Sequence, residues 1–316
     1  MTSQMLLAGV RCRKHSYDRC FGKRGVGDTG MYSSSVERFG GSEMASHQDS
    51  IEATVDVAEE NLLHKETPIE LVTGFLTDIS VMRVESPGLK EGTMYWNTWQ
   101  LLDSLFPTGG FAHSYGLETA YQGGLVTDCL SVQRFAVNSL QNTAGLLLPF
   151  VFAGHKFPIT ECWLELNKIL HAMLTNHVAR KASLAQGSAL LRTASTVFTE
   201  YPELKKMRTS CYAPTATNPH HAPLFGVICG LLGVDATTAQ RSYLFMGLRD
   251  ILSAATRLNL TGPLEAAKLQ HQVAGVAETL LSRYANRPLQ NSHSTCPLID
   301  AFQGAHDQLF SRMFCS

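Results

Sequence analysis

Apolar side chains recur at steps of three and four residues over most of the chain, from residue 94 to the end. One such stripe runs from Leu244 to Leu258, behind Asp235, which is suited to cap a helix. Another lies between Pro263, a residue typical of the first turn of a helix, and Pro288, which ends it. Sustained alternation of polar and apolar residues, the mark of a strand, does not occur in the sequence. The spacing therefore predicts an all-α fold.

The same spacing marks further helices, which we place near residues 95–105, 113–122, 129–148, 160–198 with a break as one option, 202–209 and 222–232. Together with the two helices above, they predict a single helical bundle domain of about eight to ten helices over residues 94–298. Residues 299–316 follow Pro297 and form a separate C-terminal tail.

Residues 1–93 differ in composition from the rest of the chain. Up to Glu43 they are rich in Gly, Ser and Arg and show no apolar period, so we expect an extension that is mostly disordered. An apolar run at 69–84 is compatible with a strand or a short helix. The first 17 residues lack acidic side chains, which is compatible with a transit peptide or with a leader that does not fold.

Charge is nearly balanced, with 26 Lys and Arg against 27 Asp and Glu and a net charge of −1. No overall field attracts nucleic acid or an anionic membrane, so neither is expected as a partner. The most apolar run, LLLPFVFAG at 146–154, is far shorter than the ~18 residues of a membrane span. The eight cysteines form no C-x-x-C pair, and we interpret them as reduced thiols of a cytoplasmic protein.

Charged residues make up 17% of the chain, against roughly 25% in an average soluble protein. The deficit falls on the helical part. A single globule with so few charges leaves much apolar surface in water, which usually marks a site that another protein covers. The composition therefore favours a protein that works in a complex.

Sequence motifs for catalysis are weak. GVGDTG at 25–30 has the glycine spacing of a dinucleotide loop, but it lacks the strand before and the helix after. The sequence contains no P-loop and no G-x-S-x-G motif. Its histidines, including the adjacent His220 and His221, lack the spacing of a tight metal site. We therefore predict no catalytic residues, no bound cofactor and no metal ligands. The alternative is an all-α metal-dependent hydrolase with a histidine-lined pocket between helices, which needs at least three converging ligands.

One helical stripe carries polar residues where apolar ones belong. It runs from Trp163 to Leu191 and includes His177 and Arg180. Either the helix breaks near residue 176 and restarts in a new phase, or Arg180 is a partly buried cation that needs a carboxylate or carbonyl partner. In the second case Arg180 is placed to organise an interface.

The segment SLFPTGGFAHSYGLETA at 104–120 is the densest local signal. Pro107 ends one helix, and the two glycines after Thr108 admit backbone conformations closed to other residues. Ser114 is suited to cap the next helix, which carries Glu118. From the residues alone, this segment is a tight turn between two helices.

Five segments of the helical part form a recognisable set. They are QLLDSLFPTGGFAHSYGLETA at 100–120, RKASLAQGSALLR at 180–192, HAPLFGVICGLLG at 221–233, ILSAATRLNLTGPLEAAKLQ at 251–270 and IDAFQGAHDQLFSRMFCS at 299–316. In this order, the set resembles the UreF family of urease accessory proteins over about residues 94–316. The tail text HDQLFSRMF resembles eukaryotic, plant-like members most strongly. Residues 1–93 lie outside the resemblance.

The resemblance implies an all-helical, non-catalytic protein that forms a homodimer, binds the accessory protein UreD, also called UreH, and recruits the nickel-binding GTPase UreG. In this family the assembly delivers nickel to the carbamylated active site of apo-urease, and UreF couples GTP hydrolysis to metal transfer. Nickel and GTP are then handled by the partner complex, with no cofactor tightly bound to this chain. A variant of the scaffold role is GTPase activation through an inserted arginine, with Arg180 or Arg257 as the candidate.

The resemblance also assigns candidate interface residues by motif match. In the glycine turn and the helix after it they are His113, Ser114 and Glu118, and in the body they are Arg180, Gln186, Arg257 and Asn259. In the tail they are His306, Asp307, Phe310 and Arg312, which look like a segment that orders when UreD docks. Because the tail is short and follows a proline, we expect it to be flexible in the isolated chain.

Overall fold

The computed structural model describes residues 91–212 and 218–316, all within one compact unit of the chain. The predicted extension, residues 1–93, lies outside these ranges except for residues 91–93, which begin helix α3 (Glu91–Leu102). The prediction that the extension is mostly disordered therefore concerns residues outside the described ranges.

The described residues form eleven α-helices and three short 3-10 helices, without a strand. After α3 these are η1 (Gly110–Ala112), α4 (Leu117–Gln122), α5 (Cys129–Leu146), α6 (Leu148–Lys156), α7 (Thr160–Met173), α8 (His177–Val197), α9 (Pro202–Ser210), α10 (His221–Leu231), α11 (Ala236–Arg257), α12 (Pro263–Tyr284), η2 (Leu289–Asn291), α13 (Pro297–Gly304) and η3 (Ala305–Gln308). The all-α prediction is confirmed, with one α-helix more than the predicted range.

The predicted helix 129–148 is shorter than expected and is followed by a helix that the sequence analysis missed. α5 ends at Leu146, and α6 starts at Leu148 after a bend of 42°. Pro149 lies in the first turn of α6, where the missing N–H of proline costs no hydrogen bond within the helix. The proline therefore starts a new helix in an apolar run that shows no period of its own.

The chain breaks between α7 and α8, at Asn176. The Asn176 side chain accepts hydrogen bonds from the N–H groups of Val178 at 3.0 Å and Ala179 at 3.3 Å, and so caps α8. Arg180 lies one turn into α8 and donates from Nε to the main-chain oxygen of Leu174 at 2.8 Å, at the end of α7. The break is confirmed, and Arg180 also has the carbonyl partner that the second interpretation required.

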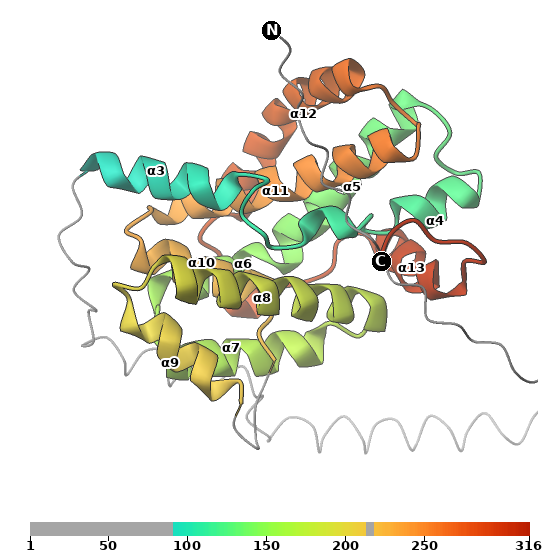
Figure 1. The fold of residues 1–316 in the computed structure, drawn as a ribbon. Helices are drawn as coiled ribbons and strands as arrows, with labels where there is room; N and C mark the ends of the chain where they lie inside the picture. Colours follow the sequence, from blue (N-terminus) through green and yellow to red (C-terminus); the bar gives the residue numbers. More distant parts are fainter. Residues whose placement is uncertain (1–90, 213–217) are drawn as a thin grey trace, which may run out of the picture. The chain divides into compact units, whose positions relative to one another are not determined.

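Helix α10 lies inside the bundle, packed against α6, α7, α8 and α11 (Figure 1). Every residue of α10 except Gly230 is buried. α6 and α10 approach so closely that a Cβ on Gly226 would overlap the main-chain oxygen of Val151, and one on Gly154 would overlap that of Pro223. Glycine is therefore required where these two helices cross.

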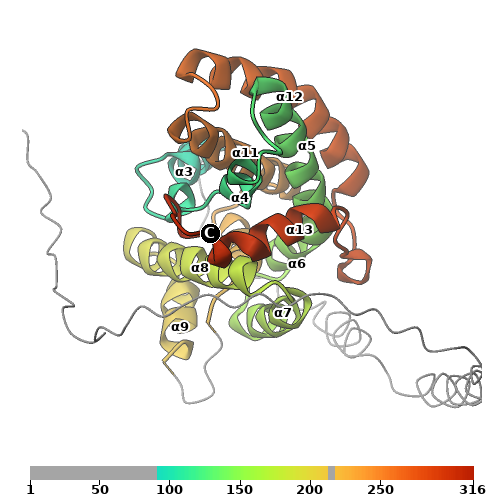
Figure 2. The same cartoon turned by 90° about the vertical axis from the view of Figure 1, so that its right-hand side faces the viewer.

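A second group of helices, α5, α11 and α12, packs beside α10 and α6 (Figures 1 and 2). The predicted stripe of α11 is buried as expected, at Leu244, Leu248, Ile251, Leu252, Ala255 and Leu258. On α12 the predicted stripe is buried except for Val276, which is 39% exposed. Helix α13 lies between α4, α5 and α8 (Figure 2).

In the described part of the chain, no single helix has both the length and the apolar composition to cross a membrane. The bent pair α5 and α6 together satisfies those two criteria. Its apolar side chains, including Val132, Leu140 and Phe150, are buried in the core.

Candidate partner-docking site

The glycine turn before α4 is built from left-handed backbone conformations. The angle φ is 55° at Tyr115 and 88° at Gly116, a region that side chains other than hydrogen rarely adopt. A Cβ on Gly116 would lie 2.8 Å from the main-chain nitrogen of Gln303 on α13. Gly116 is the N-cap of α4, so the cap predicted at Ser114 is displaced by two positions. The Ser114 hydroxyl reaches only the N–H of Glu118, at 3.4 Å.

Glu118 is the centre of the site, and only 2% of it is exposed. Its Oε1 accepts a hydrogen bond from the main-chain N–H of Met313 at 2.6 Å, and its Oε2 accepts one from that of Phe314 at 3.1 Å. Nε2 of the fully buried His306 lies 3.1 Å from the same Oε2. Hydrogen bonds to a carboxylate are roughly twice as strong as neutral ones. A single side chain of α4 therefore holds the tail at three of its residues.

A second set of hydrogen bonds holds the end of the tail against the glycine turn. Ser114 donates to the main-chain oxygen of Ser316 from its N–H at 2.6 Å and from its hydroxyl at 2.9 Å. Nδ1 of His113 lies 2.7 Å from the Ser316 hydroxyl. Burial, with His306 nearby, lowers the pKa of His113 to about 4, so this imidazole is neutral at pH 7. We call this set the tail clasp: His113, Ser114, Glu118, His306 and the main chain of residues 313–316.

Arg257, at the end of α11, joins the tail to the glycine turn. Its guanidinium lies over the ring of the buried Phe314, 4.3 Å from the centroid, and donates to the main-chain oxygen of Phe111. The neighbouring Cys315 N–H donates to the oxygen of Ala112 at 2.8 Å. Arg257 therefore packs against the clasp, as a cation–π partner of the tail.

The outer side of the tail carries the remaining predicted tail residues. Asp307 pairs with Arg312 at 3.0 Å and with His177 of α8 at 3.0 Å. The His177 hydrogen bond is the main cause that lowers the pKa of Asp307. These pairs are exposed, so each contributes little to stability. Phe310 is fully exposed and contacts none of the core.

The tail thus lies on the body, which corrects the expectation that it is flexible in the isolated chain. That expectation treated the tail as a short helix without packing. The structure gives its main-chain N–H and C=O groups partners on Glu118 and Ser114, and it buries the side chain of Phe314. The favourable term is long-range hydrogen bonding, which helix length does not describe.

The other predicted residues lie in the body, outside the clasp. Gln186 on α8 is 4% exposed. Asn259 has a φ of 58° and forms the turn after α11. Arg180 ends α7 as described above. Arg180 and Arg257, the two candidates for an inserted arginine, both donate to main-chain oxygens of this chain.

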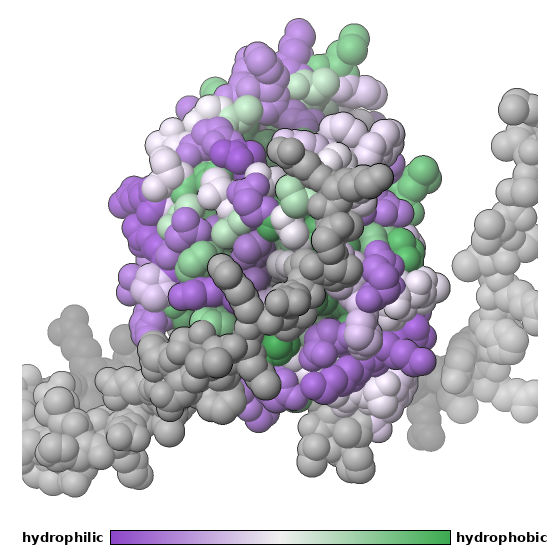
Figure 3. Space-filling view, turned by 90° about the vertical axis from the view of Figure 1, so that its left-hand side faces the viewer, coloured by the Kyte–Doolittle hydropathy of each residue, from purple (hydrophilic) through white to green (hydrophobic). Residues whose placement is uncertain are grey.

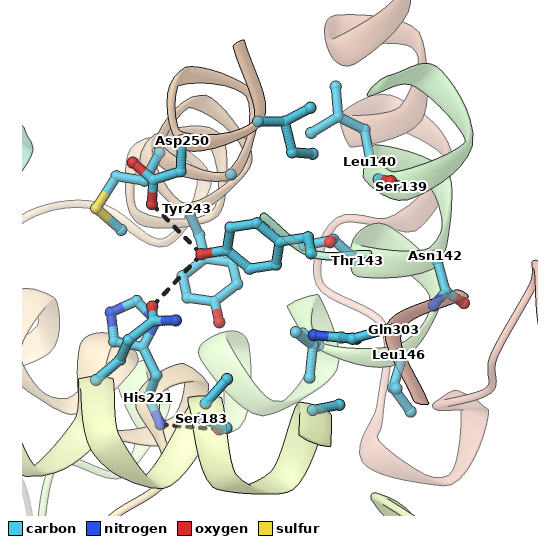
Figure 4. A pocket seen from close by; sticks show the side chains of 18 of the residues that line it. Ser139, Leu140, Asn142, Thr143, Leu146, Ser183, His221, Tyr243, Asp250 and Gln303 are labelled. Carbon is cyan, nitrogen blue, oxygen red and sulfur yellow. Dashed lines mark hydrogen bonds between the residues drawn. The ribbon is translucent and has the colours of Figure 1, made fainter. Parts of the chain in front are cut away.

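A buried polar cluster beside the turn was missed by the sequence analysis. The Tyr115 hydroxyl lies 3.3 Å from Oδ2 of Asp250 and 3.5 Å from Oε1 of Gln186 (Figure 4). Arg249 Nη2 pairs with Oδ1 of Asp250 at 2.9 Å. Burial raises the pKa of Asp250, and Arg249 opposes that shift. The available signal was helical phase, because Asp250 lies one turn before the buried Ala254 on the core face of α11.

Histidines form a pair within the described residues. Nδ1 of His171 lies 3.2 Å from Nε2 of the buried His220, and Nδ1 of His220 lies 3.0 Å from the Ser183 hydroxyl. The described ranges hold no group of three or more His, Cys, Asp or Glu side chains arranged to bind a metal ion. The hydrolase alternative needs such a group, and this part of the chain does not supply it.

Known proteins share these segments. A sequence model of the UreF family matches residues 126–274. The protein named Urease accessory protein F in Arabidopsis thaliana is 53% identical over 223 residues, covering 71% of this chain and 93% of that relative. The protein of the same name in Oryza sativa subsp. japonica is 52% identical over 221 residues, covering 70% and 85%. Urease accessory protein UreF of an Arthrobacter strain is 31% identical over 222 residues, covering 69% and 95%. By these similarities the chain belongs to the UreF family of urease accessory proteins and is a plant-like member of it.

Proposed function

We propose that this chain is a non-catalytic scaffold for urease maturation. In this proposal it binds UreD, also called UreH, and recruits the GTPase UreG, so that nickel is delivered to apo-urease as GTP is hydrolysed. The chain supplies docking surfaces and binds no cofactor tightly, while the partner complex handles nickel and GTP. It acts as a homodimer in the cytoplasm.

The observation that carries the proposal is the arrangement of the tail. The clasp fixes the main chain on the inner side, while Phe310, Met313 and Leu298 stand outward and are 106%, 59% and 60% exposed. Large apolar side chains held in place at a surface are typical of the residues that dominate protein interfaces. Because the clasp already orders the tail, docking there costs little conformational entropy.

A second exposed apolar set lies on α3. Tyr95, Trp96 and Trp99 are 57%, 71% and 57% exposed and contact one another, with Trp96 and Trp99 edge to face at 5.3 Å. On the side toward which α3 projects, hydrophobic side chains lie scattered among hydrophilic ones (Figure 3). Two separate apolar surfaces suit a protein that binds more than one partner, and they agree with its low charge content.

The test is co-purification with UreD, with and without UreG, using Phe310→Ala. Phe310 contacts none of the core, so this variant should keep its melting temperature while binding to UreD falls by about tenfold or more. Val197→Ser, at a 42% exposed position at the end of α8, is the matched control and should bind normally. Undiminished binding by Phe310→Ala would reject the tail as the docking element.

A further inference from the structure

A cavity of about 110 Å³ lies beside the tail clasp. Side chains from α5, α8, α11 and α13 line it, together with Tyr115 from the glycine turn (Figure 4). One water takes up about 30 Å³ in the liquid, so the cavity has room for a few waters or for one small molecule. It does not have room for a nucleotide or a peptide side chain of ordinary size.

Polar groups without partners face each other across this cavity. Gln303 of α13 is 8% exposed and points into the cavity, and its amide forms no hydrogen bond with the described residues (Figure 4). Ser139, on the wall formed by α5, has a buried hydroxyl without a partner among the described residues. Buried polar groups are normally hydrogen-bonded, because leaving them unpaired is unfavourable. Their presence at one cavity indicates a site for a hydrogen-bonding ligand.

The ionisable groups around the cavity leave no charge for an ionic ligand to pair with. Asp250 is neutralised by Arg249 at 2.9 Å. Asp300 is partly buried, and its Oδ2 accepts a hydrogen bond from the Ser294 hydroxyl at 2.7 Å. Burial lowers the pKa of His221 to about 4, so its imidazole is neutral at pH 7. An ion in this cavity would be buried without a counter-charge, which is strongly unfavourable.

We propose that this cavity binds a small uncharged molecule of the primary-amide class. A primary amide carries an N–H donor and a C=O acceptor side by side, which is the complement of the amide of Gln303. The hydroxyls of Ser139 and Tyr115 provide further hydrogen-bonding groups. Because Gln303 belongs to α13 and Ser139 to α5, a bound amide bridges the start of the tail to the body and favours the clasped tail.

The probe is acetamide, compared with acetate and methylammonium as charged molecules of similar size, on the full chain without partner proteins. Acetamide at tens of millimolar should give saturation-transfer NMR signals and raise the melting temperature by about 1–3 °C. The two ions should do neither. Equal effects from an ion, or no effect from acetamide, would overturn the proposal and leave a cavity that holds water only.

Two variants locate the binding. Gln303→Met keeps the side-chain volume and removes the amide, and Ala182→Leu fills the cavity from the α8 wall without altering Gln303. Both should abolish the acetamide signal, while Gln272→Met, at an exposed glutamine of α12, should retain it. Retention of the signal in either folded cavity variant would overturn the proposal. Since no partner protein is used, the outcome is independent of the scaffold function proposed above.

Discussion

The α6/α10 pair and the tail clasp are both buried, but different interactions hold them in place. α6 and α10 touch through glycines and apolar side chains such as Phe150 and Val227, all fully buried. In the clasp, the carboxylate of Glu118 and the N–H and hydroxyl of Ser114 bind the main chain of the tail. Stability in the first region is spread over a large area, whereas in the second it is concentrated in a few polar groups.

This difference means that the two regions should open separately. Apolar burial along whole helices is lost only when the helices separate, so the α6/α10 pair should open with global unfolding. The clasp depends on a handful of hydrogen bonds and should open locally at lower cost. A tail that can open while the body stays folded suits a docking element, and the following predictions test that separation.

Acidification should have the largest effect and should act on both regions. Burial lowers the pKa of His113 in the clasp and of His220 and His221 at α10 to about 4, from 6.5. Below about pH 6.5 the unfolded chain binds protons that the folded chain excludes, so stability falls as the pH drops from about 6.5 toward 4. Each histidine contributes up to about 3 kcal/mol to this loss. Urea denaturation at about pH 7.5 and pH 5 measures it, and equal stability at the two values would contradict burial of the neutral imidazoles.

Gly226→Ala should be the next most damaging change, and it acts on the α6/α10 pair. The added Cβ overlaps the main-chain oxygen of Val151, which cannot move without shifting α6, so we expect a loss of about 3 kcal/mol or more. Gly275→Ala on α12 is the control, since no atom lies within 4 Å of its Cβ, and it should gain about 0.5–1 kcal/mol. Denaturant unfolding of both variants measures the difference. A well-tolerated Gly226→Ala would show that the two helices do not pack this closely.

Arg257→Ala should have the smallest effect, and it acts on the clasp. It removes the cation–π contact with Phe314 and the hydrogen bond to Phe111, which together stabilise the docked tail by about 1 kcal/mol. Binding to UreD should weaken before the melting temperature falls. Arg241→Ala, which breaks an exposed pair with Glu278, is the control and should change neither quantity appreciably. A collapsed melting temperature with normal UreD binding would make Arg257 a core residue instead.

Helical periodicity predicted the parts of the fold in which burial follows one face of a helix. The α11 stripe from Leu244 to Leu258 is buried throughout, and the break at Asn176 was one of the two options that the polar residues of α8 left open. Periodicity could not separate α6 from α5. The run around Pro149 is apolar on every side, so it has no phase from which to infer a helix.

The candidate site was predicted in its residues but not in its geometry. Resemblance selected Ser114, Glu118 and His306, which the structure brings together. Their partners are main-chain groups, and Glu118 and Met313 are 195 residues apart in the sequence. Main-chain groups leave no trace in residue type, so neither the clasp nor the docked tail could be predicted from motifs. Asp250 was missed because a carboxylate on a core face carries no motif.

The most direct test of the separate opening of the clasp is amide hydrogen exchange of the tail in the isolated chain, before and after Glu118→Ala. The clasp predicts that the Met313 and Phe314 amides are protected, and that the variant loses about 100-fold of that protection because His306 and both amides lose their acceptor. Amides of α10 should keep their protection. Unprotected tail amides in the unaltered chain, or equal loss of protection in α10 and the tail, would contradict the account.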